Sequence, residues 1–334
     1  MRSRSPSVFV IVLSFNKKND TLECLDSLVR TDYAAYKIIL VDNSSTDETV
    51  VAVRQTFPSI HIIKNVRNLG FAEGNNVGIG HALECGADYV LLLNDDAVVN
   101  PDTIGGLVKV ADSDPKIGML CPTIVSYHDH SREFVGAKLD WPSAAAFEIE
   151  QSSADLPDYV ATDYAPGCAL IVKTSVIKEI GLLDERYFAY YEDTDWSVRA
   201  NRSGYSVVVV PSAKVRHKGT PDQSTKSATA TYYLWRNRPL FMRKHGRLRN
   251  WPSFAKSYVR KSLERIDSHI KNADPENAYA IVDGCWAGIT GQYGAQRVQA
   301  PRWFKHAVCR RLGFWLWLTG WLYFLDYRRL KREG

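Results

Sequence analysis

The chain has 334 residues, of which 45% are hydrophobic and 24% charged, as in a soluble globular protein with one large domain or two modest ones. Its formal net charge of +5 is small for this length, which argues against a dedicated nucleic-acid-binding protein. The six cysteines are scattered without a CxxC pair, so we expect a reducing cytosol and neither a zinc site nor a disulfide framework. We expect no signal peptide, and no stretch has the roughly 18 apolar residues that cross a bilayer as a helix.

Short apolar runs alternate with amphipathic stretches in the N-terminal part of the chain. The predicted strands are residues 8–15, 37–41, 60–63 and 89–93. Helices between them, with short connections, predict a doubly wound and mostly parallel α/β sheet. The first helix is expected to begin with a capping box formed by Asp20 and Glu23. No GxGxxG motif follows the first strand, so a classical dinucleotide-binding fold is not expected.

Polar residues follow each of these four strands. The clusters are Asn16, Asp42-Asn43, Asn68 with Asn75-Asn76, and Asn94-Asp95-Asp96. Ligands of open α/β sheets bind at the carboxyl ends of the strands, so neighbouring strands would bring the clusters to one edge. Adjacent carboxylates there need a compensating charge, for which Mg²⁺ or Mn²⁺ is the simplest choice. Turn formation explains each cluster equally well when it is taken singly.

The middle of the chain, up to residue 245, contains a second set of acids, and its pattern predicts a mixed sheet. We expect strands at 123–127, 133–139, 167–173 and 206–210, the last closed by Pro211. Glu192, Asp193 and Asp195 follow a run of aromatic residues, a combination that suits sugar binding and a general base. Acids in a first helical turn also complement the helix dipole, which is the alternative. His217 is either a metal ligand or a structural histidine.

The C-terminal part is basic and aromatic. Residues 224–245 predict a helix, and residues 312–325 form an apolar run with three tryptophans between pairs of basic residues. Such a run is too short to span a bilayer and suits its interface. Packing on this protein or on a second copy is the alternative. We therefore expect a domain over 1–245, with halves 1–115 and 116–245, and a helical extension over 246–334.

Seven blocks in order, between residues 8 and 245, resemble family 2 glycosyltransferases of the GT-A fold, and most of all the bacterial rhamnosyltransferases. The blocks are VFVIVLSFN (8–16), LVDNSSTDET (40–49), NLGFAEGNNVGI (68–79), YVLLLNDDAVV (89–99), GCALIVK (167–173), LLDERYFAYYEDTDWSVRANRSGYSVVVVPSAKVRH (182–217) and YYLWRNRPLF (232–241). The resemblance implies a GT-A nucleotide-binding sheet.

The resemblance also implies a role for individual residues. Asp193 matches the catalytic base, and Asp96 and His217 match the site for Mg²⁺ or Mn²⁺. Asn94 replaces the first acid of the family's DxD motif, which leaves a weaker set of ligands. The substrate-binding positions that it implies are Phe15, Asp42 and Asn75 near the base, Asp95 near the ribose, Glu192 and Asp195 supporting acceptor binding or the orientation of the catalytic base, and Arg236 and Arg238 near the diphosphate or the acceptor. For both arginines, pairing with the acids of the 184–195 block is the alternative.

The function implied is an inverting, metal-dependent hexosyl transfer in the synthesis of cell-surface polysaccharide. A dTDP- or UDP-linked sugar, rhamnose or a similar hexose, would pass to a saccharide or polyprenyl-linked saccharide. We expect a cytoplasmic enzyme that is peripheral on the inner face of the membrane through residues 310–334. Formation of a homodimer through that segment is the alternative. A nucleotidyltransferase and a non-catalytic sugar-nucleotide-binding module are the alternatives.

Overall fold

The computed structural model describes residues 4–128, 133–149, 157–219, 227–295 and 297–308. The chain divides into two compact units, the first comprising Met1–Asp140 with Ala145–Gln223 and the second Trp141–Ala144 with Ser224–Gly334. The boundary thus falls after Gln223, not after residue 245 as the sequence predicts. The reason is that helix α7 (Ala228–His245) packs on helix α9 (Pro275–Thr290) of the second unit.

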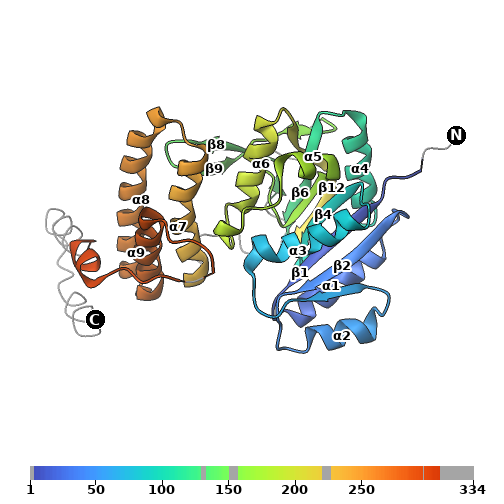
Figure 1. Ribbon diagram of the computed structural model, residues 1–334, viewed down its shortest axis with the longest axis horizontal. Helices are drawn as coiled ribbons and strands as arrows, with labels where there is room; N and C mark the ends of the chain where they lie inside the picture. The colour runs from blue at the N-terminus through green and yellow to red at the C-terminus, as the bar shows by residue number, and fades with distance from the viewer. Residues whose placement is uncertain (1–3, 129–132, 150–156, 220–226, 296, 309–334) are drawn as a thin grey trace. The chain divides into compact units, whose positions relative to one another are not determined.

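One large sheet forms the centre of the first unit (Figure 1). Its strands are β1 Val8–Ser14, β2 Tyr36–Asp42, β3 His61–Lys64, β4 Tyr89–Asn94, β5 Ala97–Val99, β6 Ile117–Ser126, β7 Glu133–Phe134, β10 Val160–Ala161, β11 Ala169–Lys173 and β12 Ser206–His217. The main path runs β10-β12-β6-β11-β4-β1-β2-β3, and β5 and β7 pair with β12 and β6. Neighbours from β4 to β3 are parallel, whereas β11 is antiparallel to both β4 and β6. The predicted mostly parallel sheet with a mixed second half is confirmed.

Helices cover both faces of this sheet. They are α1 Lys18–Val29, α2 Thr49–Thr56, α3 Gly70–Glu84, α4 Thr103–Ser113, α5 Thr174–Ile180 and α6 Glu192–Arg202, with a 3₁₀ turn η2 at Glu185–Tyr187. Alternate strand residues point to opposite faces, so Val8 and Val10 pack with α1, α2 and α4. Phe9 and Ile11 pack with α3, α5 and α6. A short hairpin of β8 Ala137–Asp140 and β9 Ala145–Glu148 also belongs to this unit, except for its connecting residues Trp141–Ala144.

Two local predictions are wrong, and both concern β12 or the residue that follows it. Asp20 and Glu23 form no capping box; α1 begins at Lys18, and both carboxylates instead accept from the ammonium of Lys218, at 2.7 Å and 2.5 Å. Pro211 does not close the strand, because a register shift between Val210 and Lys214 absorbs it as an irregularity. The strand therefore continues as far as His217.

The second unit is helical, as predicted for the C-terminal region. It contains α7, η4 (Leu248–Asn250), α8 (Trp251–Lys271) and α9. Glycines allow α9 to lie close to α7: a Cβ at Gly284 would stand 2.5 Å from the carbonyl oxygen of Tyr232. The segment 310–334 lies outside the described residues. Among the helices that the structure describes, none is long and apolar enough to cross a membrane.

Candidate active site

The carboxyl ends of the parallel strands bring three of the predicted polar clusters to one edge of the sheet. Ser14 of β1 is in register with Asp42 of β2, and the preceding residue of β1 is in register with Asn94 of β4. The side-chain amide of Asn43 donates to Asn68 Oδ1 at 3.2 Å and to the carbonyl oxygen of Gly70 at 2.9 Å. The residues after β2 are thereby tied to the start of α3 along the same edge.

Asp96 is the centre of the charged groups at this edge. Its Oδ2 lies 2.9 Å from the ammonium of Lys17, and its Oδ1 lies 3.0 Å from Nε2 of His217. The side-chain nitrogen of Asn94 lies 3.2 Å from the same Nε2. Oδ1 is buried and receives no hydrogen bond from the part of the chain that the structure describes. A carboxylate oxygen in this state, next to an imidazole nitrogen, is a suitable pair of ligands for a divalent cation.

The two neighbouring aspartates differ in charge. Burial raises the pKa of Asp95 to about 7, with the charge of Asp96 adding to the rise and Lys17 opposing it. Burial would raise the pKa of Asp96 too, but His217, when protonated, and Lys17 outweigh it and hold that pKa well below its usual range. At neutral pH Asp96 is therefore the ionised carboxylate of the motif. Among the described residues no three acid, histidine or cysteine side chains form a metal site, so Asp96 and His217 would need phosphate and water ligands to complete one.

The carboxylate of Asp193 is held by backbone donors at the start of α6. Its Oδ1 accepts from the N–H of Thr194 at 2.7 Å, and its Oδ2 accepts from the N–H of Gly167 at 2.9 Å and from the hydroxyl of Tyr164 at 3.4 Å. Burial raises the pKa of Asp193, while the two N–H groups oppose the rise. Oδ1 also accepts from the hydroxyl of Thr194 at 3.3 Å, so the described residues supply four hydrogen bonds, about the number that an ionised carboxylate can accept. A bound hydroxyl group would therefore replace one of the two long bonds, from Thr194 or from Tyr164.

Glu192 lies beside Asp193 and is only 4% exposed. Its Oε2 is buried without a hydrogen bond from any described residue. Burial, followed by the negative charge of Asp193, raises the pKa of Glu192 well above its usual value. Burial thus raises the pKa of both neighbouring carboxyl groups, and backbone N–H donors oppose the rise at Asp193.

Residues 167 and 168 connect the two carboxylate groups. The N–H of Asn94 donates to the carbonyl oxygen of Cys168 at 2.9 Å, and the N–H of Gly167 donates to Asp193. Burial raises the pKa of the Cys168 thiol, and the charges of both Asp96 and Asp193 raise it further. The thiol therefore lies within electrostatic range of both carboxylates. The structure brings the strand-end acids and the acids of α6 to one place.

A strained loop leads into α6. Phe188, Tyr190 and Tyr191 all have positive φ, at 60°, 67° and 76°. The carbonyl oxygen of Phe188 accepts from the N–H of Phe71 at 2.6 Å and of Ala72 at 3.1 Å, at the start of α3. Gly70 has φ +78°, and a Cβ on it would stand 2.5 Å from the ring of Phe188. Strain of this kind is typical of functional loops, and α3 holds this one in place.

Comparison with known proteins identifies the family of this chain. The model of "Glycosyl transferase family 2" matches residues 9–180, more than half of the chain. The chain belongs to this family. The predicted family membership is confirmed, and this glycosyltransferase is also similar to characterised rhamnosyltransferases, as predicted.

Two relatives illustrate that similarity. The N-acetylglucosaminyl-diphospho-decaprenol L-rhamnosyltransferase of Mycobacterium tuberculosis is 28% identical over 229 residues, covering 62% of this chain and 75% of that protein. The dTDP-rhamnosyl transferase RfbF of Shigella flexneri is 24% identical over 248 residues, covering 72% of this chain and 81% of that protein.

Solved structures confirm the GT-A fold. A mannosyltransferase from Pyrobaculum calidifontis, in complex with GDP-Man and Mn²⁺, superposes with a TM-score of 0.56 at 16% identity, covering 87% of this chain and 89% of that one. TarS of S. aureus, residues 1–349, superposes with a TM-score of 0.52 at 17% identity, covering 86% and 92%.

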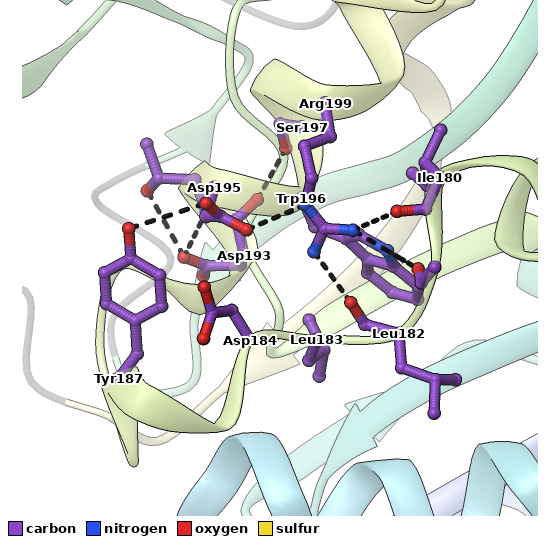
Figure 2. A network of polar contacts seen from close by, with 12 residues as sticks. Ile180, Leu182, Leu183, Asp184, Tyr187, Asp193, Asp195, Trp196, Ser197 and Arg199 are labelled. Atoms are coloured by element: carbon purple, nitrogen blue, oxygen red, sulfur yellow. Dashed lines mark hydrogen bonds and ion pairs between the residues drawn. The ribbon is translucent and has the colours of Figure 1, made fainter. Parts of the chain in front are cut away.

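Asp195 has protein partners on both sides of α6's first turn. In this glycosyltransferase Asp195 is fully buried and pairs with Arg199 at 2.9 Å, with the hydroxyl of Tyr187 at 3.5 Å (Figure 2). Arg199 in turn donates to the carbonyl oxygens of Ile180 and Leu182. Asp195 therefore ties α6 to the loop before it, and its predicted support of acceptor binding or of base orientation stays a prediction.

The predicted nucleotide-binding residues differ in how accessible they are. Phe15 is 43% exposed and free to lie against a base. Asp42 is fully buried and accepts from the N–H of Ser45, which makes it a turn-forming residue in this structure. Asn75 is 1% exposed and donates to the carbonyl oxygen of Phe71. Contacts of Asp42 and Asn75 with a base stay predictions.

The two arginines that are predicted to bind substrate have different environments in the second unit. The guanidinium of Arg236 is fully buried, donates to Asn237 Oδ1 and to the carbonyl oxygen of Gly294, and lies 4.6 Å from the ring centre of Tyr233. Its side chain is used inside the helical unit, which does not support a role at the diphosphate or the acceptor. Arg238 lies over the ring of Trp235 at 4.5 Å, and its predicted role is not tested.

The sequence analysis missed two residues of the site. Lys17 pairs with Asp96, and the signal for it was available, because it directly follows the polar end of the first strand. Tyr164 touches Asp193 across 29 positions of sequence, and no local pattern marks it.

Proposed function

We propose that this glycosyltransferase moves rhamnose or a similar hexose from a dTDP- or UDP-linked donor to a lipid-linked saccharide, with inversion at the anomeric carbon. The observation that carries the proposal is the connection of Asp96 and Asp193 through residues 167 and 168. The names of the two relatives above, one a decaprenol-linked acceptor's rhamnosyltransferase and the other a dTDP-rhamnosyl transferase, support the donor and acceptor classes.

Asp193 is the proposed general base. The acceptor oxygen forms a bond to the anomeric carbon, the bond from that carbon to the diphosphate oxygen breaks, and the acceptor proton moves to Asp193. The N–H groups of Gly167 and Thr194 hold the carboxylate in position for this transfer. A neutral Glu192 beside it adds no competing negative charge, which its raised pKa supports.

Asp96 and His217 are the residues that would hold Mg²⁺ or Mn²⁺. The buried Asp96 Oδ1 without a hydrogen bond, 3.0 Å from the imidazole nitrogen, supports this assignment. A bound divalent ion supplies positive charge to the departing diphosphate. Asp95 and Phe15 remain the proposed contacts of the ribose and the base.

The acceptor class implies work at a membrane surface. We propose peripheral attachment at the cytoplasmic face through residues 310–334, with a homodimer through that segment as the competing use. Removing 310–334 should shift the protein from the membrane fraction to the supernatant. Unchanged partitioning, or a change from dimer to monomer alone, would contradict membrane attachment.

Product analysis tests the proposed function. The full-length protein is incubated with dTDP-rhamnose or a UDP-hexose, Mn²⁺ and a polyprenyl-linked saccharide, and the released nucleotide is identified. Release of the nucleoside diphosphate with growth of the acceptor by one sugar is expected. Pyrophosphate chemistry would indicate a nucleotidyltransferase, and binding without turnover across a donor panel would indicate a non-catalytic module.

A further inference from the structure

Lys17 occupies a position at the active site that no prediction above assigns. It follows the end of β1 and directly precedes α1, and its ammonium lies 2.9 Å from Asp96 Oδ2. Its side chain is 45% exposed, whereas that of Asp96 is 10% exposed. The ammonium thus pairs with a mostly buried carboxylate of the motif and still reaches solvent.

The charge of the motif makes this lysine important. Asn94 is neutral, which leaves two acids in the motif, and the ammonium of Lys17 pairs with Asp96 at 2.9 Å. The ammonium therefore offsets one negative charge at this edge. Cation binding depends on the net negative charge of the ligands, so this edge attracts a divalent ion less strongly than a motif with three ionised acids.

Lys17 also has hydrogen-bonding capacity to spare. An ammonium has three N–H donors, and within the described part of the chain Lys17 forms its side-chain bond with Asp96. The ammonium therefore lies beside the strand-end acids with N–H donors available to a ligand, where a donor's diphosphate is expected.

We propose that Lys17 binds a non-bridging oxygen of the donor's diphosphate, bridging it to Asp96, and so provides part of the positive charge that the leaving group needs. This inference rests on the proposed function, because it requires a nucleoside diphosphate at this edge. It makes nucleotide binding only partly dependent on a divalent ion. A lysine suits the task, since its ammonium is a compact charge on a flexible stem.

The test measures binding in place of turnover. dTDP, UDP and GDP are titrated calorimetrically into the full-length protein, once in EDTA and once in saturating Mn²⁺. Lys17→Met should weaken binding of the preferred nucleotide at least about tenfold in EDTA, the loss expected for a hydrogen bond to a charged group. In Mn²⁺ the loss should be smaller, and Mn²⁺ alone should bind the variant more tightly, because Asp96 has lost its ammonium partner.

Two further variants control for charge and folding. Lys17→Arg keeps the charge and should retain most of the affinity in EDTA. Lys18→Met removes the neighbouring ammonium, which lies 3.9 Å from Glu48, and should leave binding unchanged. Thermal unfolding of each variant checks that the fold is intact.

The outcomes separate this inference from the proposed function. Equal losses with and without Mn²⁺, no loss at all, or a wild type that binds nucleotide only with Mn²⁺ would each overturn the role of Lys17 while leaving a glycosyltransferase in place. A wild type that binds no nucleoside diphosphate under either condition would overturn both.

Discussion

The two sides of the active site are constructed in different ways. On the donor side, side chains such as Asp96 and Lys17 follow parallel strands, and strand register alone brings them together. On the acceptor side, Asp193 is placed by backbone N–H groups and by a loop with three positive φ angles. The first side follows from the order of elements, whereas the second depends on distant contacts that hold a strained conformation. Substitutions on the two sides should therefore fail in different ways.

The largest effect is expected at the base itself. Asp193→Asn should lower kcat by about 10² to 10⁴, the usual contribution of general base catalysis, and leave the affinity for nucleotide almost unchanged. Steady-state kinetics and nucleotide titration measure the two quantities. Glu179→Gln, an exposed acid of α5, is the control. Near-normal turnover in Asp193→Asn would remove this residue from the chemistry.

The next effect tests the support under the acceptor side. Asp195→Ala leaves Arg199 without its buried partner and should lower the free energy of unfolding by about 3 to 5 kcal/mol in urea denaturation. The matched control is Glu264→Ala, which breaks the i,i+4 pair Arg260–Glu264 on the surface and should cost at most about 0.5 kcal/mol. Similar losses in the two variants would mean that burial does not set the strength of the Asp195 pair.

Two glycines with positive φ distinguish the contact between α3 and the loop before α6 from backbone strain alone. Gly70→Ala places a Cβ 2.5 Å from Phe188, at φ +78°, and should lower both stability and kcat. Gly86→Ala has a similar φ of +73° but no atom within 4 Å of its Cβ. Gly86→Ala should cost about 1 kcal/mol with kcat unchanged, and Gly70→Ala a further 1 to 3 kcal/mol. Equal kcat in both variants would show that the loop is not held through Gly70.

The smallest effect concerns pH on the donor side. Because burial raises the pKa of Asp95 to about 7, the folded protein holds a proton there between about pH 4 and 7 that the unfolded chain releases. This contribution to stability is present at low pH and is lost as pH rises through 7. Asp95→Asn should therefore reduce the fall in unfolding free energy between pH 6 and 8 by about 1 kcal/mol, measured in urea with EDTA. An identical pH profile in the variant would contradict the raised pKa.

The sequence predicts the parts of this protein that depend on local pattern. Apolar runs such as 8–15 and 89–93 predict strands correctly because burial on both faces demands them. The polar residues after these strands then meet at one edge through topology. The family resemblance is detectable from local sequence too, because its blocks lie mainly at strand ends and at the start of α6.

Two side chains show how a partner far away in the sequence escapes local reasoning. Asp20 looks like a helix cap, but its carboxylate is bonded to Lys218, 198 positions later. Arg236 looks like a ligand-binding residue, but the carbonyl oxygen of Gly294 and the ring of Tyr233 hold it in the interior of its unit. Local spacing cannot distinguish a free polar side chain from one with a distant partner.

The carbonyl oxygen of Phe188 accepts hydrogen bonds from the first turn of α3. The start of this helix therefore contacts the loop that precedes α6. The same helix start is tied to Asn43 and Asn68 beside the nucleotide edge. The nucleotide edge and the loop that precedes the proposed base therefore share one support at the start of α3. A substitution in this first turn should disturb both.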